Sequence, residues 1–217
     1  DWSSDVCSSD LDSFLALFEQ NGMQRELGEY VMETALRQME TWLADDLHLT
    51  ISVNIDAHHH LQRPDFLARL QQILASHPAV SPRKLEIEIL ETAALQDLAQ
   101  VSQRIAECRK LGVQFAIDDF GTGYSSLSYL HMFPINHLKL DRSFVSEIGD
   151  DTDGSVICDA TIGLAHSLGQ KVVAEGIETE EQLSYLKRIG CDMGQGYLFS
   201  RPLPADQLIA FIGQHNS

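Results

Sequence analysis

The fold can be inferred from FAIDDFGTGYSSLSYL, residues 115–130. The segment continues an apolar run that starts at Val113, ends in the adjacent carboxylates Asp118 and Asp119, and then turns at Gly121-Thr122-Gly123. Two neighbouring anions repel each other unless cations or hydrogen-bond donors compensate their charge. The pattern is therefore typical of two structures, a divalent-metal site or a surface turn with a glycine hinge, and residues elsewhere must distinguish them.

Similar apolar runs recur along the chain and predict strands. They lie at 49–53, 85–89, 113–117, 137–140, 171–174 and 194–198. Helical patterns lie before and between them, at 13–46 with a break at Asn21-Gly22, and at 65–76, 94–111, 127–132, 155–168, 180–189 and 205–212. Near-continuous apolar strands are expected where both sheet faces are covered, and repeated strand–helix units indicate a parallel sheet, open or closed.

Local end signals support these elements. Thr179 with Gln182 three residues later is a capping-box pattern at a helix start. Gly112, Gly169 and Gly190 follow predicted helices, where a glycine commonly ends the last turn. Six strands are two fewer than a (β/α)8 barrel needs. An open doubly wound sheet also fits six strands, but no GxGxxG turn follows the first of them.

The first residues do not fit this pattern. Residues 1–11, DWSSDVCSSDL, are rich in Ser and Asp and show neither helical nor strand periodicity. They resemble the translation of a sequencing adapter, so we interpret them as a non-native or disordered lead and exclude them from the fold. We expect the domain to occupy 12–217 and to lack its native N-terminus, which would account for two missing strands.

Composition limits the partners and the location. The chain has 15 Lys+Arg against 32 Asp+Glu, a net charge of -17, which argues against binding a nucleic acid polymer. A small anionic ligand held through metal ions stays possible. No apolar run approaches the ~20 residues of a membrane span. The four cysteines are widely spaced and form no CxxC pair, so we expect a cytoplasmic protein, or the cytoplasmic domain of a membrane-anchored sensor.

Polar residues mark the carboxyl ends of the predicted strands. They are Asn54, Glu88, Glu91, Asp118, Asp119, Lys139, Asp141, Glu175 and Gln195. In a parallel α/β fold these positions converge on one face, where active sites lie. Oxygen ligands suit Mg²⁺ or Mn²⁺, and two such ions about 3.5–4 Å apart can clamp a phosphoryl displacement. The sequence therefore favours the metal site over the plain turn.

Five segments together resemble the EAL domain family. They are LEIEILETAAL (85–95), FAIDDFGTGYSSLSYL (115–130), LKLDRSFV (138–145), VVAEGIET (172–179) and QGYLFSRPLP (195–204), and the similarity runs from about residue 12 to the C-terminus. The resemblance implies a TIM-like (β/α)8 barrel, here missing its first strands. It also implies a bacterial signalling phosphodiesterase that uses two Mg²⁺ or Mn²⁺ ions to linearise cyclic di-GMP to pGpG.

The resemblance also implies roles for individual residues. Asn54, Glu88, Asp118 and Asp119 correspond to metal ligands, with Asp118 bridging the two ions. Lys139 and Glu175 correspond to the residues that hold and activate the nucleophilic water, and Gln195 to a glutamine near the metals. Glu91 corresponds to the glutamate that fixes the loop carrying Gly121, Thr122 and Gly123. Asp141 and Tyr197 are candidate substrate-binding residues.

The sequence departs from the family pattern in two places. Leu90 stands where the family usually has Thr, from which we expect little effect. The Glu-Ala-Leu segment that gives the family its name, and that supplies a further metal ligand, is missing. We therefore expect the chain as it stands to be impaired as an enzyme.

The alternative function is a cyclic di-GMP receptor or a protein-interaction module. The family also implies a homodimer and an upstream sensory or GGDEF-type domain.

Three other features have mainly structural explanations. His58, His59 and His60 invite a transition-metal interpretation, but adjacent histidines cannot all face one ion, and we predict a solvated loop. His137 is predicted to serve packing or capping. Tyr197 and Phe199 are expected to pack under the barrel mouth, with stacking of an aromatic ring on a guanine base as the alternative.

Overall fold

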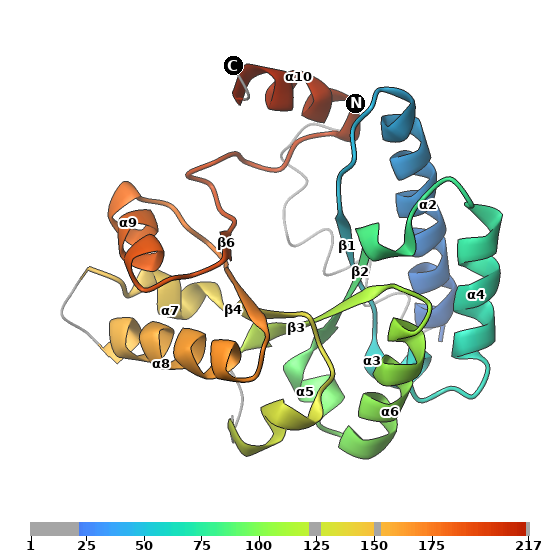
Figure 1. The fold of residues 1–217 in the computed structure, drawn as a ribbon, viewed down its shortest axis with the longest axis horizontal. Helices are drawn as coiled ribbons and strands as arrows, with labels where there is room; N and C mark the ends of the chain where they lie inside the picture. The colour runs from blue at the N-terminus through green and yellow to red at the C-terminus, as the bar shows by residue number, and fades with distance from the viewer. Residues whose placement is uncertain (1–21, 122–126, 150–152, 216–217) are drawn as a thin grey trace.

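A computed structural model describes residues 22–121, 127–149 and 153–215. Its centre is a sheet of six parallel strands in sequential order. The strands are β1 (Ile51–Asn54), β2 (Leu85–Leu90), β3 (Gln114–Phe120), β4 (His137–Leu140), β5 (Lys171–Ala174) and β6 (Met193–Gly194). The sheet curls, and the helices lie around its outside (Figure 1). This confirms the α/β prediction and gives an open, curled part of a TIM-like barrel.

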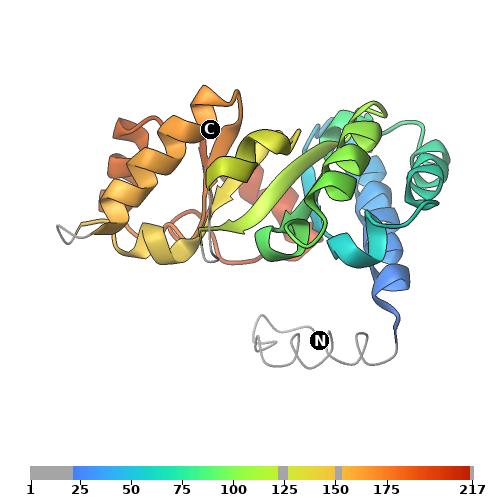
Figure 2. The ribbon, with the colours of Figure 1, turned by 90° about the horizontal axis from the view of Figure 1, so that it is seen from below.

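The helices alternate with the strands along the chain. They are α2 (Gln24–Ala44), α3 (Ala57–His60), α4 (Phe66–Ser76), α5 (Glu91–Ala94), α6 (Leu98–Arg109), α7 (Arg142–Ser146), α8 (Asp153–Ser167), α9 (Glu180–Arg188) and α10 (Ala205–His215), with 3-10 turns η1 (Pro82–Lys84) and η2 (Leu127–Met132). Seen at 90° to the first view, the blue and teal helices lie at one end of the molecule and the orange helices at the other (Figure 2). Within the described residues, no helix has the length and apolarity needed to cross a bilayer.

The two faces of the sheet have different side chains, because successive residues of a strand point to opposite faces. The outer face is apolar, and Ile87, Phe115, Leu138 and Val172 on it are almost fully buried under the helices. Burying one such side chain stabilises the fold by roughly 1.5–3 kcal/mol. The inner face carries Ser52 and Asn54 beside Glu86 and Glu88, as the register of β1 and β2 requires. The curl therefore has an apolar outside and a polar inside.

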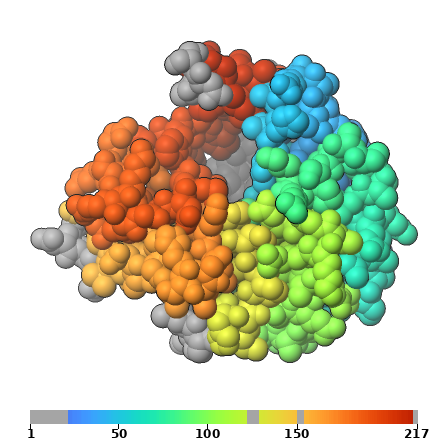
Figure 3. All heavy atoms as spheres, in the orientation of Figure 1, coloured from blue at the N-terminus to red at the C-terminus, as the bar shows by residue number. Residues whose placement is uncertain are grey.

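The inner side is open within the described part of the chain. The six strands do not close on themselves, so β1 and β6 are the two sheet edges. In the space-filling view the molecule is hollowed between the orange-red C-terminal segments and the blue N-terminal segments (Figure 3). The polar inner face thus borders this hollow.

Several predicted elements are confirmed. The capping box at Thr179 is present, because its side chain accepts from the Gln182 amide while Gln182 reaches back to Thr179. Gly112, Gly169 and Gly190 have φ of +103°, +75° and +83°, the left-handed conformation expected after a helix. Cys108 and Cys158 lie fully buried in the core as free thiols.

Other predicted elements are wrong in extent or type. The helix expected over 94–111 covers only Leu98–Arg109, because Asp97 caps its start by accepting from the Gln100 amide, and the short helix Glu91–Ala94 precedes it. The segment 127–132 forms a 3-10 turn, and the last strand covers only Met193–Gly194. His58, His59 and His60 belong to the short helix α3 and do not form a loop. Residues 1–21, with the lead and the first predicted helix, lie outside the described residues.

Candidate active site

The centre of the candidate site is Lys139, which projects from the inner face of β4. Its Nζ lies 2.8 Å from Glu88 Oε2, 2.9 Å from Asp118 Oδ1 and 2.7 Å from Glu175 Oε1. Glu88 lies near the end of β2, Asp118 lies near the end of β3, and Glu175 directly follows β5. The ammonium side chain is only 8% exposed. Four segments that are remote in sequence thus meet at one buried charge cluster.

The adjacent aspartates are brought to this cluster by an irregular strand end. Asp119 has φ +54°, a left-handed conformation that is uncommon outside glycine, and its amide donates to Asp118 Oδ1 at 3.1 Å. The register between β3 and β4 shifts between Ile117 and Phe120. As a result, carboxylate oxygens of Asp118, Asp119 and Glu175 all lie within 4.8 Å of one another. Strained backbone at a polar strand end is frequent at functional sites.

Burial perturbs the ionisation of the cluster. It raises the pKa of Glu88 and of Glu175, since the Asp118 charge adds to the effect and Lys139 only partly opposes it. Burial and then the charges of Asp118 and Asp141 raise the pKa of Asp119. Burial alone would lower the pKa of Lys139, but its bonds to Glu175 and Glu88 outweigh it and the net direction is upward. The lysine is therefore a permanent cation.

The donor set fits divalent metal ions. Four carboxylates (Glu88, Asp118, Asp119 and Glu175) around one ammonium leave three uncompensated negative charges when all are ionised. Oxygen-only ligands suit Mg²⁺ and Mn²⁺, which bind carboxylates together with water and substrate phosphates. The raised pKa values of Glu88, Asp119 and Glu175 agree with this, because a bound cation would lower them again and favour the ionised carboxylates. These residues could hold the metal ions that the sequence predicts.

Asn54 and Gln195 lie at the two ends of this row. Asn54 is exposed at the end of β1 and pairs in register with Glu88, so both point from the same face of the sheet. Gln195 donates from Nε2 to Glu175 Oε1 at 2.7 Å. The structure therefore brings Gln195 to the cluster and places Asn54 beside it on the neighbouring strand.

Glu91 anchors the segment that follows Asp119. It is 1% exposed, its Oε2 accepts from the Gly121 amide at 3.0 Å, and its Oε1 accepts from the Tyr129 hydroxyl. Glu91 thus ties the residues on both sides of 122–126 to the start of α5. Thr122 and Gly123, the other predicted loop residues, lie outside the described residues.

Asp141 and Tyr197 are less closely connected to the cluster. Asp141 caps α7 by accepting from the Ser143 amide at 3.0 Å, although its charge also acts on Asp119. Tyr197 is 54% exposed and stacks against the Arg201 guanidinium, 4.7 Å from the ring centre. Phe199 is 45% exposed. The expectation that these two rings pack under the barrel mouth is wrong, because both residues are exposed.

The inner face carries a second group of polar side chains, Ser52, Glu86 and His137, which the sequence analysis did not predict. Glu86 is buried, accepts from the Ser52 hydroxyl at 2.9 Å and contacts Nδ1 of His137. The packing or capping role predicted for His137 is therefore wrong, because its ring pairs with a buried carboxylate. The alternation of polar residues in LEIEI (85–89), in HLK (137–139) and in SVN (52–54) is the signal that could have indicated this group.

Comparisons with known proteins agree with this architecture. The family model described as EAL domain matches residues 5–202. The bifunctional diguanylate cyclase/cyclic di-GMP phosphodiesterase MucR of Pseudomonas aeruginosa is 39% identical over 201 residues, which are 92% of this chain and 29% of that protein. The chain thus spans less than a third of this relative.

Two solved structures show the same likeness. A complex of the PaMucR phosphodiesterase with c-di-GMP superposes with a TM-score of 0.82 at 40% identity, covering 91% of this chain and 79% of that one. A manganese/cy-diGMP complex of Klebsiella pneumoniae BlrP1 superposes with a TM-score of 0.72 at 29% identity, covering 83% and 44%. On the family match, the fold and the cluster at its strand ends, this chain belongs to the EAL domain family.

Proposed function

We propose that this chain hydrolyses cyclic di-GMP to linear pGpG with the help of two Mg²⁺ or Mn²⁺ ions. The observation that carries the proposal is the buried cluster of Lys139 with Glu88, Asp118 and Glu175 at the carboxyl end of the sheet. The named cyclic di-GMP phosphodiesterase among its relatives, and the manganese in one solved relative, point to the same chemistry.

We assign different roles in the hydrolysis to the residues of the cluster and to Asn54. Asn54, Glu88, Asp118 and Asp119 would hold the metals, which neutralise phosphate charge and supply a nucleophile at neutral pH. Glu175 would accept the proton of the attacking water, a role that its raised pKa favours. The attack would form a bond from the water oxygen to phosphorus and break one bond from phosphorus to a ribose oxygen, which takes up a proton from solvent and leaves as a hydroxyl. Lys139 keeps Glu175 in place and offsets charge on the phosphate.

A receptor or protein-interaction role is the second candidate. Among the 217 residues of the chain, no Glu-Ala-Leu segment supplies the further metal ligand that the family pattern has. A site that has lost a ligand could still bind the nucleotide while turning it over slowly. Binding and turnover therefore have to be measured separately.

The wider context of the chain is part of the same proposal. Because the chain spans less than a third of MucR, we place it within a longer protein with an upstream sensory or GGDEF-type domain. We also propose a homodimer and a cytoplasmic location. The location rests on cysteine usage, since Cys108 and Cys158 are buried free thiols and the four cysteines of the sequence form no CxxC pair.

The test is a pair of measurements on the purified chain. Incubation with cyclic di-GMP and Mn²⁺ should yield pGpG, and Glu175→Gln should lower the rate at least a hundredfold, whereas Glu181→Gln on the exposed side of α9 should not. Calorimetry with the nucleotide in Ca²⁺ separates binding from turnover. Binding without any pGpG would favour the receptor role. Neither binding nor product would contradict both hydrolysis and the receptor role, and would leave the protein-interaction role.

A further inference from the structure

The three consecutive histidines that follow β1 do not share one environment. His60 turns into the core, is 2% exposed, and its Nδ1 lies 2.9 Å from the carbonyl oxygen of Asp56. His58 is exposed and His59 is half-buried, on the outer side of the same short helix α3. His60 therefore cannot share an ion with its two neighbours, whereas His58 and His59 remain available to one.

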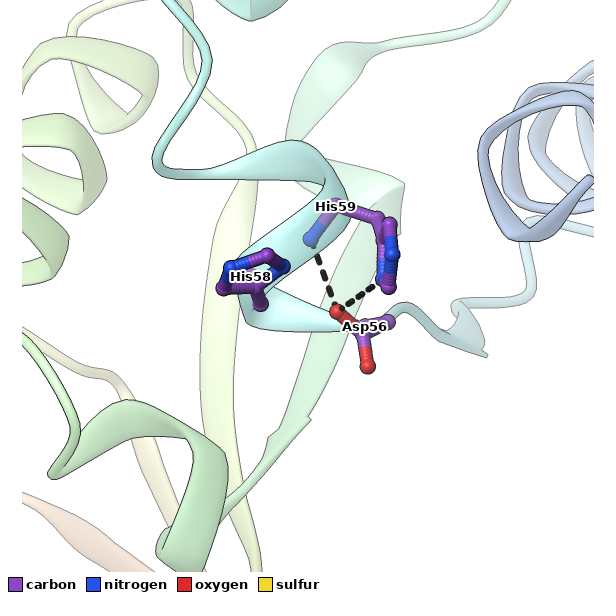
Figure 4. Close-up of side chains that lie close together, drawn as sticks. All are labelled: Asp56, His58 and His59. Atoms are coloured by element: carbon purple, nitrogen blue, oxygen red, sulfur yellow. Dashed lines mark hydrogen bonds and ion pairs between the residues drawn. The ribbon is translucent and has the colours of Figure 1, made fainter. Parts of the chain in front are cut away.

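His58 and His59 converge with a carboxylate at the start of the helix. Oδ1 of Asp56 accepts from the His59 amide at 2.8 Å and lies 2.9 Å from His59 Nδ1. The rings of His58 and His59 are 4.9 Å apart and nearly perpendicular. One ligand atom from each of the three residues lies within 4.8 Å of the others. In Figure 4 the Asp56 carboxylate oxygen lies between the two rings.

We propose that Asp56, His58 and His59 form a binding site for a late first-row divalent metal ion, represented by Zn²⁺, Ni²⁺ or Cu²⁺. Imidazole nitrogen suits these ions, whereas the oxygen cluster around Lys139 suits Mg²⁺ and Mn²⁺. The protein would thus carry two chemically distinct metal sites.

The distances agree with coordination. Ligands about 2.1 Å from zinc lie roughly 3.0–3.4 Å apart at angles between a right angle and a tetrahedral one. The 2.9 Å between Asp56 Oδ1 and His59 Nδ1 is close to this range. An ion between them would replace the proton of that hydrogen bond. His58 is exposed, so its ring can close the remaining distance by rotating about its side-chain bonds, and water would complete the coordination.

Other surface histidines also lie beside carboxylates, and they can be compared with this group. His48 lies 3.3 Å from Asp46 and His166 lies 2.8 Å from Asp192, so each forms a histidine–carboxylate pair. Within the described ranges, however, the group at α3 is the one that places two histidines and a carboxylate within the reach of a single ion. A chelate with two imidazoles should bind more tightly than either single pair, and His48 is therefore the matched control.

The experiment uses the metal alone with the chain free of any affinity tag. After treatment with a chelator, Zn²⁺ is titrated by calorimetry into the wild type, His58→Ala, His59→Ala and His48→Ala, and Co²⁺ absorption reports nitrogen coordination. The same titration in an Asp118→Asn background separates this site from the oxygen cluster. Circular dichroism verifies that each variant is folded. If His59→Ala disturbs α3 because the Asp56–His59 contact is lost, then His58→Ala, which keeps that contact, is the deciding variant.

The expected result is one Zn²⁺ site that persists in Asp118→Asn. It should weaken at least tenfold in His58→Ala and in His59→Ala, and keep its affinity in His48→Ala. The proposal is overturned if His58→Ala binds Zn²⁺ as the wild type does, if His48→Ala weakens binding equally, or if Asp118→Asn alone abolishes it.

Discussion

Nζ of Lys139 lies 2.7 Å from Oε1 of Glu175, and this contact links the neighbouring strand ends of β4 and β5. The same oxygen accepts from Gln195 Nε2 at 2.7 Å. Two donors on one oxygen restrict the rotation of the carboxylate, so the orientation of Glu175 depends on both residues. Gln195 is thereby a positioning residue for the group that we propose to take the proton from water.

Replacing Lys139 by methionine should damage both stability and turnover. The substitution keeps the length of the side chain but leaves Glu88, Asp118 and Glu175 without their shared ammonium. Breaking a buried ion pair costs about 3–5 kcal/mol, so the metal-free variant should unfold at a clearly lower denaturant concentration. Mn²⁺ should raise its melting temperature more than that of the wild type, because the metal would replace the lost charge. The rate of pGpG formation should fall at least a hundredfold.

Lys171→Met is the control for this variant. Lys171 is exposed at the opposite end of β5, so its replacement should change the free energy of unfolding by no more than about 0.5 kcal/mol. Equal effects of the two substitutions on stability and rate would show that the buried cluster has no special role.

Glu91→Gln should release the segment that follows Asp119. Glutamine keeps one oxygen but presents an amide group to one of two donors, the Gly121 amide and the Tyr129 hydroxyl. A buried donor left without an acceptor costs about 1–3 kcal/mol. We expect the free energy of unfolding to fall by about 2 kcal/mol and the Gly121 amide to exchange at least tenfold faster, as measured by hydrogen exchange.

Tyr129→Phe separates the two bonds of Glu91. It removes the hydroxyl donor and leaves the bond to the Gly121 amide, so Gly121 should stay protected. If Gly121 exchanged at the wild-type rate in Glu91→Gln as well, Glu91 would not be what holds this segment.

The parts of the fold that local patterns determine were predictable. The apolar residues indicated the five longer strands, because one face of each strand is buried under the helices. The expectation that both faces are covered is wrong, because the inner face carries polar side chains such as Glu86 and Glu88. The strand ends then identified the cluster, since parallel strands place their carboxyl ends together. Thr179 and Gly112 marked a helix start and a helix end through bonds between near neighbours in sequence. The family prediction is confirmed by the match over residues 5–202.

The features that sequence reasoning missed depend on tertiary contacts or on overlooked caps. The contact of His137 with Glu86 joins residues 51 positions apart and requires the register of three strands. The last strand ends at Gly194, and the chain then passes so close to Ile177 that a Cβ at Gly196 would lie 2.2 Å from the Ile177 backbone. Asp56 and Asp97 are caps whose signal was present in the sequence, and they explain where α3 and α6 begin.

Two helical glycines should respond in opposite ways to alanine. A Cβ at Gly28 in α2 would lie 2.3 Å from Nε2 of the buried His60, so Gly28→Ala should destabilise the protein by about 1–3 kcal/mol through overpacking. A Cβ at Gly163 in α8 would meet nothing within 4 Å, so Gly163→Ala should stabilise it by roughly 0.5–1 kcal/mol. Chemical denaturation measures both, and a gain in Gly28→Ala would contradict the close contact of α2 with α3.

The charge of Asp192 should contribute stability that disappears in acid. Burial opposes its ionisation, but the bonds from the Val172 amide at 2.9 Å and from His166 at 2.8 Å outweigh burial and lower the pKa of Asp192. A lowered pKa in the folded state means that the unfolded chain takes up the proton first as the pH falls. The stabilisation is therefore complete above the unfolded pKa of about 3.9 and is lost as the pH falls through the folded pKa.

Asp192→Asn, which keeps an acceptor but removes the charge, should be less stable than the wild type at pH 7, and the difference in unfolding free energy should shrink below about pH 4. A difference that stays constant from pH 7 to pH 3 would show that the asparagine changes packing and that the charge itself contributes nothing.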